Sequence, residues 1–202
     1  MRTKFRNVGL KLLGRPRAAL RRFRRGGDGV AAIEFALIAP VMISLFFGII
    51  EGAVGLGAAR RATVAANGLA DLVSQSSTVT TTQLDNIFTG MEQIVDVDVD
   101  PTVNPATFNI VSVRLNSSNQ VVVNWSCTST SGTPPYAANS VYPRSIDAAQ
   151  FSTSPNVIIG EVSYNYIPTF TSRFVSNFSL ARFGSRWPRN SGGVALSGGC
   201  PT

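Results

Sequence analysis

The 202-residue sequence contains no histidine, only two cysteines and few charged residues, which make up 14% of the chain. Histidine is the most common general base and a frequent metal ligand, so its absence removes much acid–base and metal chemistry. The sequence also lacks a Walker loop, a GxSxG motif and any cysteine cluster with zinc spacing. We therefore expect no catalytic residues, no metal and no cofactor, and we interpret the protein as a non-enzyme.

Acidic residues are scarce, and the basic residues are unevenly distributed. Residues 1–25 hold ten Lys and Arg and no Asp or Glu, whereas the rest of the chain holds eight basic residues against eleven acidic ones. The net charge of +7 therefore describes an N-terminal leader, while the body of the chain is slightly acidic. This distribution argues against a nucleic-acid partner, because such partners require a basic surface on the folded domain.

A long apolar run follows the basic leader. Val30–Ile50 contains a single charge, Glu34, and the apolar character continues beyond it. A membrane-spanning helix needs roughly 20 apolar residues, and the run is longer than the core of a cleaved signal peptide. The basic residues place the leader, residues 1–29, in the cytoplasm by the positive-inside rule. The remaining segments are then a transmembrane helix over 30–59, its helical extension over 60–75 and an external domain over 76–202.

The expected fold class is α+β and membrane-anchored, with the long N-terminal helix continuing into a small external domain that contains an antiparallel β-sheet. Apolar residues in 81–94 recur at helical spacing and predict a second, short helix. Four alternating or apolar segments predict strands: 95–99, 108–115, 120–127 and 156–168. The polar turn Asn116–Asn119 makes the middle two a hairpin. We expect a polar linker at 76–82, and the tail, 169–202, shows no clear period.

Cys127 and Cys200 both fall in the segment that we place outside the cytoplasm. Disulfides persist in oxidising compartments such as the bacterial periplasm. A bond between these two cysteines would close a loop of about 70 residues and stabilise the domain by roughly 3 to 4 kcal/mol in the chain-entropy model. The alternative is a pair of free, buried thiols.

The segment around Glu34 carries the most informative pattern. A lone carboxylate near the start of a spanning helix is costly in lipid, and so predicts a functional role. If a peptidase cuts after Gly29, Val30 keeps a free ammonium, which Glu34 of a neighbouring subunit could neutralise in apolar surroundings. The alternative is that Glu34 simply lies near the interface and extends its carboxylate to water.

Two further features lie at the far end of the apolar run. Gly48 and Gly52 have GxxxG spacing, which lets two helices approach closely in lipid. Glu51 falls near the outer interface, where a solvated carboxylate costs little.

GVAAIEFALIAPV followed by FFGIIE resembles the N-terminal signature of TadE-like proteins, pseudopilins of the tight-adherence (Flp/Tad) pilus system. The resemblance implies that a membrane prepilin peptidase cuts between Gly29 and Val30, and that Glu34 and Phe35 are the pattern shared with Flp pilins. It implies a minor pilin or pseudopilin of the bacterial inner membrane, with a periplasmic C-terminal domain, that assembles an adhesive pilus. The expected partners are the membrane, the peptidase, pilins and other Tad assembly proteins. The main alternative is an unprocessed, membrane-tethered periplasmic binding or adhesin domain. A third interpretation is an envelope hydrolase whose Asp, Glu or Ser chemistry carries no local signature.

Overall fold

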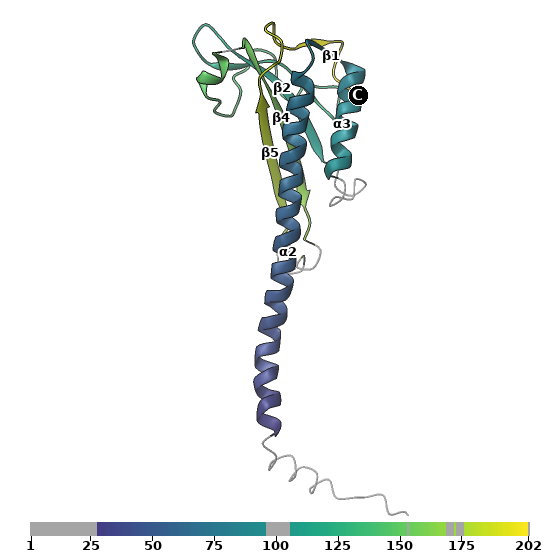
Figure 1. Ribbon diagram of the computed structural model, residues 1–202, viewed down its shortest axis with the longest axis vertical. Coiled ribbons are helices and arrows are strands. Elements are labelled where there is room, and N and C mark those ends of the chain that lie inside the picture. The colour runs from purple at the N-terminus through teal and green to yellow at the C-terminus, as the bar shows by residue number, and fades with distance from the viewer. Residues whose placement is uncertain (1–27, 96–105, 153, 169–171, 173–175, 202) are drawn as a thin grey trace, which may run out of the picture. The chain divides into compact units, whose positions relative to one another are not determined.

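The computed structural model of the protein describes residues 28–95, 106–152, 154–168, 172 and 176–201 (Figure 1). The chain divides into two compact units, Met1–Phe47 and Gly48–Thr202, and we call the second unit the C-terminal domain. The strand predicted at 95–99 lies outside the described residues except for Val95, which ends a helix.

Helix α2, Asp28–Ser74, is the longest element, with 47 residues. Within the first unit its apolar side chains are exposed; Phe35, for example, is 73% exposed. In the C-terminal domain, one stripe of the same helix is fully buried, and it consists mainly of alanine: Ala58, Ala62, Ala65, Ala66, Leu69, Ala70 and Val73. The helix therefore continues past the apolar run and packs on a domain, as its helical spacing predicts.

A four-stranded sheet forms the centre of the C-terminal domain. Its strands are β2 (Thr107–Leu115), β3 (Val121–Thr128), β4 (Asn156–Tyr166) and β5 (Phe178–Arg186). Their order is β3-β2-β4-β5, and each neighbouring pair is antiparallel. The α+β architecture with an antiparallel sheet is thus confirmed.

The hairpin between β2 and β3 follows the predicted turn. The backbone N–H of Asn116 donates to the carbonyl of Gln120 at 2.9 Å, and Asn119 adopts a positive φ of 60°. Asparagine tolerates this left-handed conformation better than most residues, so the polar turn sequence suits the geometry.

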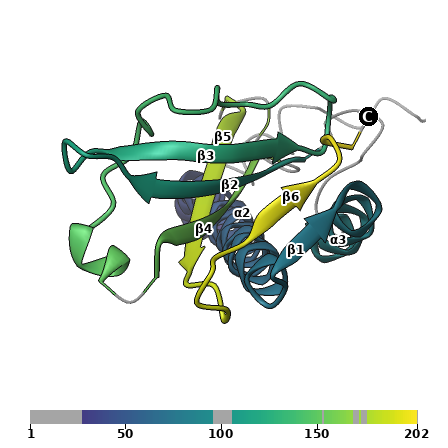
Figure 2. The same ribbon diagram turned by 90° about the horizontal axis from the view of Figure 1, so that it is seen from above.

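Both faces of the sheet are covered. Helices α2 and α3 (Thr81–Val95) lie on one face (Figure 2), where the core includes Phe108, Ile110 and Ile158. Behind the opposite face, the segment between β3 and β4, with the short 3-10 helix η1 (Ala148–Phe151), packs on a second cluster around Val113 and Ile159. Strand β4 is buried on both sides over most of its length, which explains its nearly continuous apolar sequence.

Two glycines allow α2 to approach the sheet closely. A Cβ atom at Gly160 of β4 would collide with the backbone carbonyl of Ala66 and would lie 3.0 Å from the backbone nitrogen of Ala70. A Cβ atom at Gly184 of β5 would lie 2.9 Å from the Cα of Asn67. Small residues on both surfaces therefore set the distance between helix and sheet.

Two of the sequence-based interpretations are wrong in part. The segment 76–82, expected to be a linker, contains strand β1 (Thr78–Thr80) and the start of α3, and the tail contains β5 and β6 (Ala195–Ser197). Strands β1 and β6 form a parallel pair, in register from Thr78 with Ala195 to Thr80 with Ser197. Pairing with a segment more than 100 residues away, rather than local alternation, makes these short pieces strands.

Candidate functional site

The residues of the predicted processing pattern all lie in the first two turns of α2. The helix begins at Asp28, so the Gly29–Val30 bond falls in its first turn. Backbone N–H groups in a first turn have no partner within the helix, which makes this turn the easiest to open. Val30 is 60% exposed, and Glu34 and Phe35 are exposed as well. The structure therefore presents the whole pattern on an open helical surface.

Val30 and Glu34 are four residues apart and share one face of α2. The rise between them is about 6 Å, and helical side chains lean toward the N-terminus, so the carboxylate of Glu34 is directed toward Val30. A negative charge close to a helix N-terminus is also favoured by the helix dipole. This arrangement can hold a positive charge at Val30.

Gly48 and Gly52, the predicted packing pair, lie on one face of α2 with open space beside them. A Cβ atom built at either glycine would meet nothing within 4 Å. Their surface is therefore accessible to another helix, which is the geometry that GxxxG spacing requires.

Glu51, between these glycines, is half-buried and accepts a hydrogen bond of 2.7 Å from the hydroxyl of Tyr166 at the end of β4. The tyrosine is 3% exposed, and its ring lies against Gly55 and near the ring of Phe178, with 5.1 Å between the ring centroids. Sequence reasoning treated Glu51 as a solvated carboxylate and missed this contact. The available signal was weak, because nothing local links two residues separated by 115 positions.

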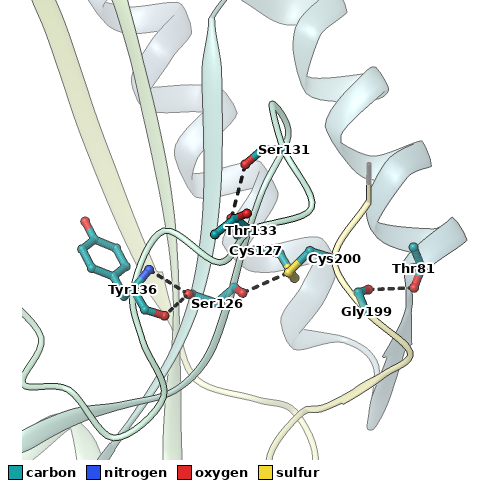
Figure 3. Close-up of a disulfide and its surroundings, with 8 residues drawn as sticks. All are labelled: Thr81, Ser126, Cys127, Ser131, Thr133, Tyr136, Gly199 and Cys200. Atoms are coloured by element: carbon teal, nitrogen blue, oxygen red, sulfur yellow. Dashed lines mark hydrogen bonds between the residues drawn. A yellow bond between two sulfur atoms is a disulfide. The ribbon is translucent and has the colours of Figure 1, made fainter.

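Cys127 and Cys200 form a disulfide, as predicted (Figure 3). Cys127 lies at the end of β3, where it is fully buried, and Cys200 follows β6 near the C-terminus. Next to the bond, the Ser126 hydroxyl donates to the carbonyl of Tyr136 at 2.8 Å and accepts from its N–H at 3.1 Å. The disulfide therefore joins the C-terminal segment to the central sheet.

The buried carboxylate of Glu161 on β4 binds polar side chains of the segment between β3 and β4. Glu161 is 6% exposed and accepts hydrogen bonds from the hydroxyls of Tyr142, at 2.6 Å, and Tyr136, at 3.0 Å. The guanidinium of Arg144 lies 3.3 Å from the same carboxylate and 5.0 Å from the ring centroid of Phe183. A buried charge is tolerated only when it is paired and hydrogen-bonded, and this one has both kinds of partner. Sequence reasoning missed the cluster, although Glu161 is the one charge in β4.

The two tyrosines respond to this environment. Burial, together with the negative charge of Glu161 and the hydrogen bond to it, raises the pKa of Tyr136 to about 12. Burial and then the hydrogen bond to Glu161 raise the pKa of Tyr142 still further above its ordinary value. Both hydroxyls are protonated donors at neutral pH, and their hydrogen bonds tie the segment between β3 and β4 to β4.

In the described part of the chain, one helix is long and apolar enough to cross a membrane, and it is the segment of α2 that starts at Gly29. None of its most apolar window is buried within the structure. The described residues contain no group of three or more His, Cys, Asp or Glu that could hold a metal ion.

Residues 29–71 match the family model described as TadE-like protein. The chain thus carries a TadE-like segment. The match begins at Gly29 and ends three residues before the end of α2, so it covers both the exposed apolar part of the helix and its buried alanine stripe. The resemblance drawn from the sequence is confirmed over these residues. Comparisons with curated proteins and with solved structures returned no significant match.

Proposed function

We propose that this protein is a minor pilin or pseudopilin needed to assemble a Tad-type adhesive pilus. The observation that carries the proposal is the TadE-like match over residues 29–71, which starts at the glycine before the proposed cut. The exposed positions of Glu34 and Phe35 on α2 support it. The role is structural, through contacts with other proteins and lipid. It involves no cofactor and no nucleic acid.

A prepilin peptidase cuts between Gly29 and Val30 in this proposal. A protease needs extended backbone, and the start of α2 can supply it at low cost because first-turn N–H groups have no helical partners. Glycine adds conformational freedom immediately before the bond. Cleavage removes the basic leader and leaves an apolar helix with a new ammonium group at Val30.

Glu34 then has a specific task. A free ammonium and a carboxylate that enter lipid separately are both costly, and pairing them removes most of that cost. Because Val30 and Glu34 share a helix face, the carboxylate can neutralise the ammonium of its own chain until a neighbouring subunit presents one. We propose that this exchange guides each subunit into register during assembly, while Gly48 and Gly52 allow close helix packing.

The proposed location is the bacterial inner membrane, crossed once, with a cytoplasmic N-terminus and a periplasmic C-terminal domain. The ten basic residues of the leader support this orientation. The disulfide between Cys127 and Cys200 supports an oxidising compartment for the domain. The proposed partners are the membrane, the prepilin peptidase, pilins and other Tad assembly proteins.

The N-terminus of the protein purified from native membranes tests the proposal. Removal of 29 residues from the 202-residue chain leaves 173, so intact mass and terminal peptide mapping should show a 173-residue protein that begins at Val30. Replacement of Gly29 with phenylalanine should leave the full-length chain. Gly48→Phe, in the same helix, is the matched control for processing, and it should still be cut.

Glu34 is tested separately, because it acts after the cut. Glu34→Leu should be processed and inserted but should reduce piliation, whereas Glu51→Gln should leave processing and insertion unchanged. An intact chain from Met1 in native membranes would instead favour the alternative, an unprocessed, membrane-tethered binding or adhesin domain. Normal piliation by both the Gly29 and Glu34 variants would contradict the mechanism.

A further inference from the structure

We propose that the end of the sheet formed by Tyr166, Ile167 and Phe178 lies in the headgroup region of the membrane crossed by α2. The C-terminal domain would then touch lipid through its sheet and not only through its helix. This inference rests on the membrane anchoring in the proposed function and adds to it a defined lipid-contact surface.

The first step is the position of Glu51 along α2. Val30–Ile50 has 21 residues, and as a helix it is about 31 Å long, which matches the roughly 30 Å of a hydrocarbon core. Glu51 is the first charged residue after this run. It therefore falls at the boundary between the hydrocarbon and the headgroups on the far side of the membrane.

The second step is the contact between Glu51 and the sheet. The hydroxyl of Tyr166 lies 2.7 Å from the carboxylate of Glu51, and a Cβ at Gly55 would lie 3.8 Å from the tyrosine ring. The ring of Phe178 is the neighbour of Tyr166, and these residues pair in the register of β4 and β5. Strands β4 and β5 run beside α2 (Figure 1). The end of β4 and the start of β5 therefore lie within about one helical turn of Glu51.

The third step is the character of the side chains at this end of the sheet. Ile167 and Phe178 are each 44% exposed, and Leu56 of α2 is 55% exposed. The described residues 162–168 and 176–181 contain no charged side chain. The other half of β5 and the residues after it carry three arginines: Arg182, Arg186 and Arg189. The charged side chains of β5 thus begin at Arg182, and the exposed Phe183 (46%) and Trp187 (54%) lie among these arginines.

These observations fit a headgroup environment better than water. Tyr166 is itself buried, and its hydrogen bond to Glu51 holds this end of the sheet at the level of Glu51. The exposed side chains of Phe178 and Ile167 supply the apolar surface there, and exposed aromatic and aliphatic side chains enter the boundary between headgroups and acyl chains. A partly apolar end, without charge over the described residues 162–168 and 176–181, next to the point where the helix leaves the hydrocarbon is a surface that lipid would cover.

Tryptophan fluorescence in vesicles tests the contact. Ile167→Trp and Phe178→Trp are made singly in the full chain and reconstituted into phosphatidylcholine vesicles whose acyl chains are brominated near the headgroup. Bromine quenches tryptophan only at short range. Val141→Trp is the matched control, because Val141 is an exposed apolar residue, 60% exposed, bridged to Val122, which belongs to the opposite end of the sheet. The native Trp125 and Trp187 provide the wild-type background.

The expected result is loss of the emission added at positions 167 and 178, while the emission added at position 141 remains. Flotation of the vesicles shows independently whether the protein has inserted. Inserted protein whose added emission is unquenched at both positions would overturn this inference alone and leave those side chains for a protein partner. Protein that does not float with the vesicles would overturn the anchor and this inference together.

Discussion

The hydroxyl of Tyr166 donates a hydrogen bond to the carboxylate of Glu51 across 115 positions of sequence, with 2.7 Å between the two oxygens. The tyrosine is buried and the carboxylate half-buried, so this bond joins the end of β4 to α2 at the first polar position after the apolar run. The contact gives Glu51 a structural role in the C-terminal domain that is separate from the role proposed for Glu34.

The Tyr166–Glu51 bond leads to a first prediction. Tyr166→Phe keeps the ring against Gly55 but removes the donor, and it should lower the free energy of unfolding by about 1 kcal/mol, as for a hydrogen bond to a partly exposed charge. Glu51→Gln keeps an acceptor oxygen and should cost less. Urea unfolding of the detergent-solubilised protein, followed by near-ultraviolet circular dichroism, measures both. Equal losses in the two variants would contradict this interpretation.

The close approach of α2 to the sheet leads to a second prediction. Gly160→Ala places a methyl group against the backbone of Ala66 and Ala70, which cannot move without shifting the helix, so we expect a loss of about 3 kcal/mol or more. Gly90→Ala is the matched control on α3, because a Cβ there meets nothing within 4 Å. This change should stabilise the protein by about 0.5 to 1 kcal/mol through helix propensity. Thermal unfolding of the two variants should shift in opposite directions.

The disulfide leads to a third prediction. The two cysteines are separated by 73 positions, so the bond restricts a long loop of the unfolded chain and should contribute about 4 kcal/mol. Addition of a reductant should lower the free energy of unfolding of the wild-type protein by about that amount. The Cys127→Ser/Cys200→Ser double variant should have the lower stability from the outset and should not respond to the reductant. Equal stability with and without reductant in the wild type would contradict the prediction.

The Glu161 cluster leads to a fourth prediction, for alkaline pH. The pKa of Tyr136 is raised to about 12, and that of Tyr142 is raised further, from an ordinary value of 10. The folded protein therefore keeps protons that the unfolded chain loses above pH 10. The contribution of these tyrosines to stability is fully present below pH 10 and declines as the pH rises from 10 through 12.

The absorbance of tyrosinate during an alkaline titration measures this effect. Ionisation in the native protein should be delayed relative to the urea-unfolded chain, and Glu161→Gln should reduce the delay at Tyr136, because it removes the negative charge beside that hydroxyl. Tyr142→Phe should remove the most delayed part of the titration. Loss of the Tyr142 hydroxyl also leaves one acceptor site of the buried Glu161 carboxylate unfilled, so we expect the free energy of unfolding to fall by about 1 to 2 kcal/mol at neutral pH. Native and unfolded chains that titrate together would contradict both statements.

The success of sequence reasoning differed between strands for a physical reason. Strands β2, β3 and β4 are strongly apolar because they lie in the sheet interior or face two covered sides, and their patterns predicted them. Strand β5 lies at one edge of the sheet, as β3 does at the other, but only Leu180 and Gly184 of its nine residues are buried. A period carried by one leucine and one glycine is not detectable, so this strand was missed.

The site was predicted unevenly for a similar reason. Gly29, Val30, Glu34 and Phe35 are neighbours in sequence, so a local pattern identified them, and the family match begins at the same glycine. Three partners of Glu161 come from a segment 17 to 25 positions earlier in the chain, and a fourth, Asn109, lies 52 positions earlier. An isolated acid in an apolar strand does not show which residues will surround it.

Sequence alone determined the apolar helix, its basic leader, the strand-rich domain and the TadE-like segment, because each depends on residues that are close together along the chain. Tertiary structure decided which distant residues meet: Tyr166 with Glu51, Cys127 with Cys200, and Gly160 with the backbone of Ala66. These pairs depend on how α2 packs against the sheet and how the strands are ordered. Both are decided by many small packing and burial energies acting together across the domain, and no single segment of sequence contains that information.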